Sequence, residues 1–131
     1  MYKYETHCHT SEGSKCSHIT AEKLVEFYKN QGFDGVFITD HFFNGNTTVD
    51  RNQSWDKMVD DFCLGFENAK RAGEKLGIDV FFGFEYSYHG TDVLVYGLDK
   101  QWLLSHPDVM SLGTTEFCDF ARSEGALVIH A

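Results

Sequence analysis

The amino-acid sequence predicts an α/β fold with a largely parallel sheet. The chain has 131 residues, the length of one domain, and 42% of them are hydrophobic, which is enough for a packed core. Apolar segments typical of strands alternate with segments whose apolar residues recur at helical spacing. Histidines and carboxylates follow the apolar segments, as expected where strand ends form a ligand-binding face.

The first half of the chain is expected to form two strands, each followed by a helix. Residues 2–9 predict a strand, and a helix follows that Thr20 can cap and that Gly32 ends. The continuous apolar run in 34–41 is typical of a strand buried on both faces. After a polar loop, Ser54 is expected to cap a long amphipathic helix.

The second half is expected to add three strands and one helix. Residues 79–88 and 92–98 predict two strands that are joined by a short turn. The only proline, Pro107, indicates a loop. A helix over 114–124 and a strand over 126–131 complete the order β-α-β-α-β-β-α-β.

Composition argues against several classes of protein. The net charge is -9 and no basic stripe is present, so binding to a nucleic-acid backbone is disfavoured. The sequence shows neither a signal segment nor a membrane-spanning apolar run, which predicts a cytoplasmic protein with reduced thiols. The four cysteines form no C-x-x-C pair, and Cys63 and Cys118 are expected to be buried in helices.

Six residues that can bind metal or support ligands gather at the predicted strand ends: His7, His9, Asp40, His41, Glu85 and His130. His7 and His9 are two residues apart on a strand, so their imidazoles project from one face and can meet one metal ion. Burying Glu85 without a partner would cost several kcal/mol, and a bound metal would supply the missing positive charge.

Imidazole together with carboxylate suits zinc, manganese or iron. A carboxylate can bridge two ions about 3.5–4 Å apart, the usual arrangement for hydrolysing phosphate esters with a metal-activated water. The pattern therefore predicts a metal-dependent hydrolase with its site at one edge of the sheet.

Four short segments resemble, in order, the first motifs of the polymerase and histidinol phosphatase (PHP) superfamily. They are ETHCHT at 5–10, FITDH at 37–41, GFE at 83–85 and LVIHA at 127–131. The resemblance covers essentially the whole chain. It implies a metal-dependent phosphoesterase on a distorted (β/α)7 barrel with two or three divalent metal ions. Residues 1–131 are then expected to hold only the first half of the barrel, ending after the fourth motif.

The resemblance implies a role for each matching residue. His7 and His9 would bind the first metal, and Glu85 would bridge the first and second metals. His130 would bind the second metal, and His41 would bind the third.

The remaining ligand of the third metal is open. Many family members carry Asp or His about 25 residues before the histidine that matches His41, and this position falls on Cys16. Glu12 and His18 lie in the same loop and are alternatives. Asp40 is expected to orient a ligand through a hydrogen bond.

Other polar residues have more modest expected roles. Lys15 and Arg51 lie in loops near the predicted site, where either can hold a phosphate oxygen. His89, in the turn after residue 88, can touch substrate or metal. Cys8 lies between the two histidines and is expected to point to the opposite face of the strand, where it packs.

Members of the family continue beyond the fourth motif with strands that carry a late Asp-x-His pair. Without that pair the first and second metals would each lack a ligand, so weaker metal binding is expected. The exposed edge of a half barrel is also expected to allow pairing with another copy.

We therefore expect hydrolysis of a phosphorylated small molecule or nucleotide. One alternative is a non-catalytic metal-binding or structural module. Another is an amidohydrolase-like metallohydrolase, because H-x-H also opens those barrels, although the later TDH and GFE segments fit them poorly.

Overall fold

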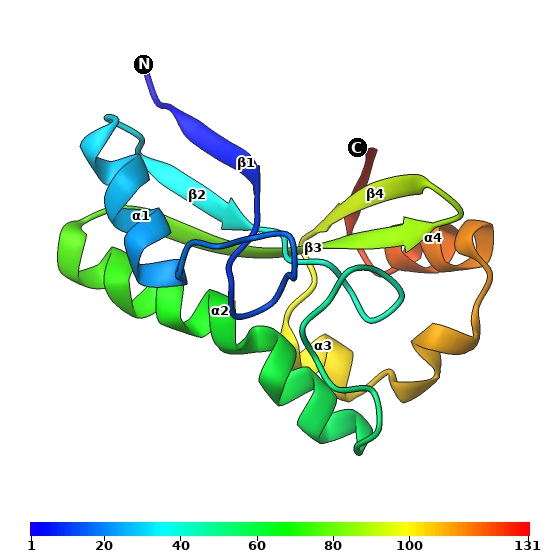
Figure 1. Cartoon of the computed structure of the whole chain (residues 1–131). Coiled ribbons are helices and arrows are strands. Elements are labelled where there is room, and N and C mark those ends of the chain that lie inside the picture. Colours follow the sequence, from blue (N-terminus) through cyan, green and yellow to red (C-terminus); the bar gives the residue numbers. More distant parts are fainter.

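Five strands form one curled sheet in the order β1-β2-β3-β4-β5 in the computed structural model, which describes residues 1–131 (Figure 1). The strands are β1 (Tyr4–Cys8), β2 (Gly35–Ile38), β3 (Asp79–Tyr88), β4 (Thr91–Tyr96) and β5 (Leu127–His130). The α/β class is as predicted, and the sheet is the curled half barrel that the PHP resemblance implies.

The sheet is less parallel than the sequence predicts. β1, β2 and β3 pair in parallel, whereas β4 lies antiparallel between β3 and β5. The reason is the two-residue turn after β3, because so short a connection can join only antiparallel neighbours. His89 and Gly90 both adopt positive φ there, at 43° and 84°.

The helices are α1 (Ala21–Asn30), α2 (Trp55–Leu76), α3 (Lys100–Leu104) and α4 (Thr114–Ser123), with a 3-10 turn η1 (Pro107–Ser111). The two predicted caps are confirmed: the side chain of Thr20 accepts from Lys23 N–H, and that of Ser54 accepts from Lys57 N–H. The sequence predicted neither α3 nor η1, which are five residues each. None of these helices has the length and apolar character needed to span a membrane.

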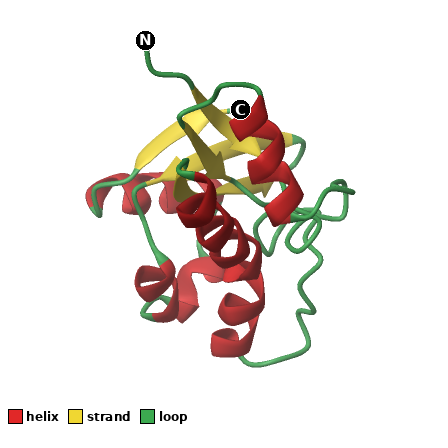
Figure 2. Cartoon of the chain, turned by 90° about the vertical axis from the view of Figure 1, so that its left-hand side faces the viewer, coloured by secondary structure: helices red, strands yellow, loops and turns green.

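The helices cover one face of the sheet, here called the outer face, and both termini lie on its other side (Figures 1 and 2). One core cluster packs α2 and α4 against β3 and β4, with Phe62, Phe84 and Phe117 fully or almost fully buried. A second cluster packs α1 and α2 against β1, β2 and the start of β3. These two clusters hold the strands that carry the candidate ligands.

The opposite, inner face carries partly exposed apolar side chains on β2, β3 and β4. Phe37 of β2 pairs with Phe81 of β3, and their rings stack 4.6 Å apart. The hydroxyl of Tyr96 on β4 donates to the carbonyl of Thr6 on β1 at 2.5 Å, although the two residues are 90 positions apart. This hydrogen bond crosses the inner face and joins two strands that are not neighbours in the sheet.

α2 passes unusually close to the ends of β1 and β2. A Cβ at Gly65 would collide with the side chains of Thr10 and Asp40, both of which are buried. Glycine is otherwise a poor residue for a helix interior, so its presence here is explained by the close approach.

We predict that Gly65→Ala destabilises the protein by about 1–3 kcal/mol, because the added methyl group overpacks a fully occupied site. Helix propensity alone would change stability in the opposite direction, by about 1 kcal/mol in favour of alanine. Denaturant unfolding followed by circular dichroism measures the difference. Lys70→Ala on the exposed side of α2 is the control and should stay within about 0.5 kcal/mol; equal stability of the two variants would contradict the prediction.

Candidate metal centre

Three chain segments bring the candidate ligands together. His7 lies near the end of β1 and His9 follows that strand directly, while His41 follows β2. Beyond Ile38 the chain continues beside β3, where the Glu85 N–H donates to the Asp40 carbonyl at 3.0 Å. The Phe42 N–H donates in turn to the Glu85 carbonyl at 2.9 Å. These two backbone hydrogen bonds place His41 directly beside Glu85.

Three imidazoles converge on a single carboxylate oxygen. Oε2 of Glu85 lies 3.1 Å from Nε2 of His7, 2.6 Å from Nε2 of His9 and 3.6 Å from Nδ1 of His41. The two nearer imidazoles also approach each other, with 3.2 Å between their Nε2 atoms. His7, His9 and Glu85 thus form one group whose ligand atoms face a common centre.

The electrostatics of Glu85 follow from this arrangement. Burial of the side chain, which is 5% exposed, raises its pKa, but hydrogen bonds from His9 and His7 and the charge of His41 lower it to about 2. The pKa of His41 is lowered by burial and by the neighbouring His9. At neutral pH Glu85 is therefore a carboxylate, and the lowered pKa of His41 favours its neutral imidazole, which are the forms of these two side chains that bind metal.

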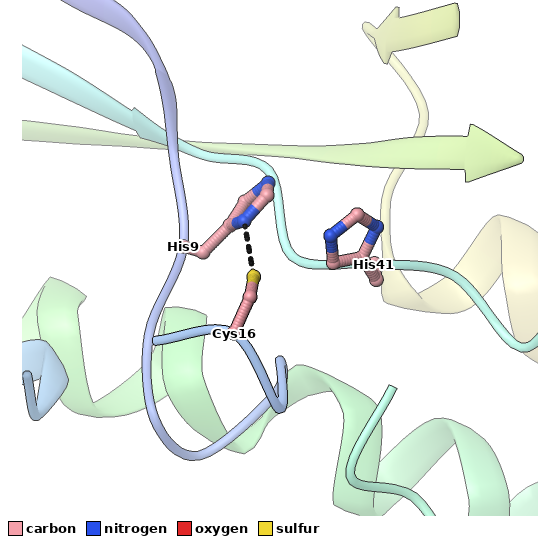
Figure 3. A group of neighbouring side chains, drawn as sticks. All are labelled: His9, Cys16 and His41. Atoms are coloured by element: carbon pink, nitrogen blue, oxygen red, sulfur yellow. Dashed lines mark hydrogen bonds between the residues drawn. The ribbon is translucent and has the colours of Figure 1, made fainter. Parts of the chain in front are cut away.

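A second group lies on the other side of His9. The Nδ1 atom of His9 is 3.2 Å from Sγ of Cys16. His41 completes this set of three residues, whose ligand atoms lie within 4.8 Å of one another (Figure 3). In the tautomer that donates Nε2–H to Glu85, this Nδ1 accepts from the thiol. The sulfur ligand makes this group softer than the first.

The residues present fit a divalent metal ion. Nδ1 of His41 is buried without a hydrogen-bond partner, an arrangement that is costly unless another group binds the nitrogen. Tetrahedral ligand atoms about 2.1 Å from an ion are roughly 3.4 Å apart. The spacings of His7 from His9 and from Glu85, 3.2 and 3.1 Å, are close to this value, and the 2.6 Å between His9 and Glu85 would have to widen around an ion. The donor set of imidazole, carboxylate and thiol is also a metal-binding combination.

Asp40 belongs to neither group of candidate ligands but supports the segments that carry them. Its buried carboxylate accepts from the Thr10 N–H at 2.6 Å, from the Thr10 hydroxyl at 2.7 Å and from the Ser14 hydroxyl at 2.8 Å. Burial raises the pKa of Asp40, and the hydrogen bonds from Thr10 and Ser14 oppose that rise. The Ser14 hydroxyl also accepts from the backbone N–H of His41 at 3.0 Å, so Asp40 helps to position His41 through Ser14.

Sequence reasoning did not identify Thr10 and Ser14 as site residues. Both are fully buried small polar residues next to the first histidine motif. Buried hydroxyls need partners, but a sequence does not show which hydroxyls are buried, so no clear signal was available.

Two of the proposed third-metal ligands lie elsewhere. Both carboxylate oxygens of Glu12 accept from the Ala21 N–H at the start of α1, at 3.1 and 3.0 Å, and Asn68 donates to one of them. Glu12 therefore caps a helix instead of facing the metal groups, a role that the positive end of the helix favours. His18 is exposed and makes no side-chain contact with either group. Of the three alternatives, only Cys16 joins the candidate ligands.

The structure does not bring His130 to the centre, contrary to the expectation for the end of β5. Glu85 pairs with Leu94 and Leu94 pairs with Ile129, whereas His130 pairs with Val93 in the next row. Because successive residues of a strand point to opposite faces, His130 belongs to the outer face and Glu85 to the inner face. The register of the antiparallel strand β4, which lies between them, determines this difference.

The three candidate substrate contacts, Lys15, Arg51 and His89, lie on three separate segments of the chain. The Arg51 guanidinium donates to the Gly45 carbonyl at 2.7 Å, a hydrogen bond within the loop that contains both residues. Lys15 is exposed, and its backbone N–H donates to the Asn46 carbonyl. His89 is exposed in the hairpin turn and packs edge-on against Tyr88.

Cys8 packs as predicted. It is buried with the residues of α1 and β2, and its thiol donates to the Phe37 carbonyl at 3.1 Å. Burial raises the pKa of this thiol, which keeps it protonated and inert.

Comparison with solved structures supports the fold. The fold is similar to that of a "putative metal-dependent phosphoesterase" from Bifidobacterium adolescentis, with a TM-score of 0.52 and 23% sequence identity. The match covers 76% of the present chain and 29% of that protein, and at this identity it supports the fold alone. Comparison with curated protein sequences finds no match.

A family model described as the PHP domain matches residues 5–125. The matched region contains His7, His9, His41 and Glu85, the residues that converge in the structure. Because the match extends over nearly all of the 131 residues, the chain belongs to the PHP domain family.

Proposed function

We propose that this protein is a metal-dependent phosphoesterase. The observation that carries the proposal is the convergence of His7, His9 and His41 on one oxygen of the buried Glu85 carboxylate. PHP family membership and the description of the similar structure both support a hydrolase of this type. The chain spans only 29% of that structure's length, so the activity of the whole protein is part of the proposal.

Each residue has a distinct task in this proposal. His7, His9 and Glu85 hold one divalent ion, and Cys16 with His41 supports a further ion, so that two or three ions of zinc, manganese or iron are the expected cofactors. Bound ions supply the positive charge that activates water and neutralises a phosphate ester. Asp40, through Thr10 and Ser14, keeps the ligand-bearing segments in place.

The substrate we propose is a phosphorylated small molecule or a nucleotide. With a net charge of -9, the protein repels anions at long range, so the metal ions themselves must attract the phosphate. The exposed Lys15 side chain is available as an additional phosphate contact at the rim.

One observation favours a second candidate function, that of a metal-binding module without turnover. Both candidate groups include His9, and each needs an atom of the same ring. If only one of the groups can be filled at a time, the protein would bind a single ion and lack the second ion that phosphate hydrolysis commonly uses.

We predict that Glu85→Gln lowers metal affinity at least tenfold and abolishes hydrolysis of a generic aryl phosphate, because the amide removes the only charged ligand of the first group. Isothermal titration with zinc and manganese and a turnover assay with added metal measure the two effects. Glu67→Gln is the matched control, since Glu67 forms a half-exposed ion pair with Lys100 away from the site.

The two candidate functions give different results in this experiment. Metal bound by the native protein with turnover that Glu85→Gln removes supports the phosphoesterase. Tight metal binding without turnover supports the module, and unchanged metal binding in Glu85→Gln would contradict both.

We also predict that zinc protects one thiol. Cys16 is the only exposed cysteine, so a thiol reagent should label one cysteine per native chain rapidly. Burial raises the pKa of Cys63 to about 12, which keeps that thiol unreactive. Zinc should block the labelling of Cys16, and manganese should do so much less, because thiolates prefer softer ions.

Cys16→Ser is the control and should lose the rapid labelling. Full labelling of the zinc-loaded native protein would show that Cys16 is not a ligand.

The metal-free protein should lose stability in acid through Glu85. Its pKa is lowered from 4.5 to about 2 in the folded state, so the folded state favours the ionised carboxylate. This contribution is present above pH 4.5 and is lost as the pH falls toward 2. Across that window, native protein in a chelator should lose roughly 1–3 kcal/mol more stability than Glu85→Gln. Parallel stability curves for the two proteins would contradict the lowered pKa.

A further inference from the structure

The backbone pairing between the segment after β2 and β3 ends abruptly. Glu85 is bonded on both sides, to the Asp40 carbonyl and to the Phe42 N–H. In a parallel ladder the next bonds would join Ser87 to the carbonyl of residue 42 and to the N–H of residue 44. The backbone does not make these bonds, because the Phe42 carbonyl accepts from the Gly45 N–H at 2.9 Å and the chain turns away.

The side chain of Asn44 replaces the missing backbone. Its Nδ2 donates to the Ser87 carbonyl at 2.6 Å, and its Oδ1 accepts from the Ser87 N–H at 3.2 Å. Ser87 lies two residues after Glu85, so its backbone groups point to the same side of β3, away from β4. The carboxamide thus pairs with β3 as a backbone peptide of a neighbouring strand would.

This pairing places Gly45 against the ring of His41. A Cβ at Gly45 would lie 3.4 Å from Nδ1 of His41 and 2.6 Å from Oγ of Ser87. A side chain at position 45 would therefore crowd the imidazole. Asn44 and Gly45 are adjacent in the chain, so the two hydrogen bonds of Asn44 determine how closely Gly45 approaches His41.

The His41 ring depends on such packing because no hydrogen bond holds it. Its Nδ1 is buried without a partner and lies 3.6 Å from Oε2 of Glu85, farther than the imidazoles of His7 and His9. The ring packs against that of His9, with 4.4 Å between the ring centroids (Figure 3). Gly45 is the second contact that limits its rotation.

We propose that Asn44 is a positioning residue for His41. By pairing with Ser87, its carboxamide keeps Gly45 against the imidazole and holds the ring in the orientation that His9 and Cys16 need to share an ion with it. The positioning is a property of the metal-free protein. Its consequence for metal binding rests on the proposed function.

The residue type is specific to this task. The Ser87 N–H requires an acceptor and the Ser87 carbonyl requires a donor, and the asparagine side chain offers one of each. Alanine at position 44 would offer neither. Aspartate has the same shape, but it would place a carboxylate oxygen against the Ser87 carbonyl, where two acceptors repel each other.

Nuclear magnetic resonance of the metal-free full chain at neutral pH tests the positioning. Asn44→Ala and Asn44→Asp should accelerate amide hydrogen exchange of Ser87 at least tenfold, because its N–H loses a firmly held acceptor. Both variants should also shift or broaden the imidazole signals of His41, which a residue that only stabilises the loop would leave unchanged. Asn52→Ala is the matched control, since Asn52 is exposed in the same loop, and it should alter neither signal.

Zinc binding tests the consequence for the candidate metal centre. The zinc concentration that half-protects Cys16 from a thiol reagent should rise at least tenfold in Asn44→Ala and in Asn44→Asp, the usual effect of removing a residue that orients a ligand. Asn52→Ala should match the native protein. Circular dichroism and the thermal midpoint verify that each variant is folded, and Asn44→Asp serves alone if Asn44→Ala impairs folding.

Three results would overturn the proposal. The first needs no variant: a Ser87 amide in the native protein that exchanges as fast as the exposed loop amides. The second is faster Ser87 exchange in the variants with unchanged His41 signals. The third is equal zinc protection of Cys16 in the native protein and both variants. A native protein that binds no zinc would contradict the proposed function instead, and the metal-free signals of His41 would still decide the role of Asn44.

Discussion

The buried carboxylate of Asp40 holds together the segments on which the candidate metal centre depends. It lies just after β2 and takes three hydrogen bonds from Thr10 and Ser14, at the end of β1 and in the following loop. A carboxylate that is 2% exposed requires such partners, since leaving it unpaired would be strongly destabilising. The same hydrogen bonds therefore satisfy Asp40 and fix the positions of His9 and His41.

Glycines make this arrangement sterically possible. A Cβ at Gly13 or at Gly65 would collide with Asp40, so the loop and α2 can both close over the carboxylate only without side chains there. The loop between β1 and α1 is also held in place at Glu12, whose carboxylate caps α1. The ligands of the centre thus depend on residues that never touch it, as is usual where function needs fixed geometry.

Charge balance explains why the histidines gather around Glu85. This carboxylate is buried in an acidic protein, and imidazoles are its only nearby positive or polarisable partners. Without metal, their hydrogen bonds lower the pKa of Glu85 to about 2. With metal, the same nitrogens and oxygen would turn to the ion, so one cluster serves both states. His9 is the residue that couples the two candidate groups, because its ring nitrogens face Glu85 on one side and Cys16 on the other.

The sequence by itself determined most of the secondary structure and the main ligands of the candidate site. Helix caps at Thr20 and Ser54 and the placement of His7 and His9 on one face follow from local chemistry and strand periodicity. The meeting of these histidines with His41 and Glu85 was predictable because ends of neighbouring strands converge on one edge of a sheet.

Only the tertiary structure decided that β4 separates β3 from β5, which places His130 on the outer face. It also decided that Cys16 faces His9 while Glu12 caps a helix. The physical reason is that register and loop conformation are set by hydrogen bonds between residues far apart in the chain, which no local pattern encodes.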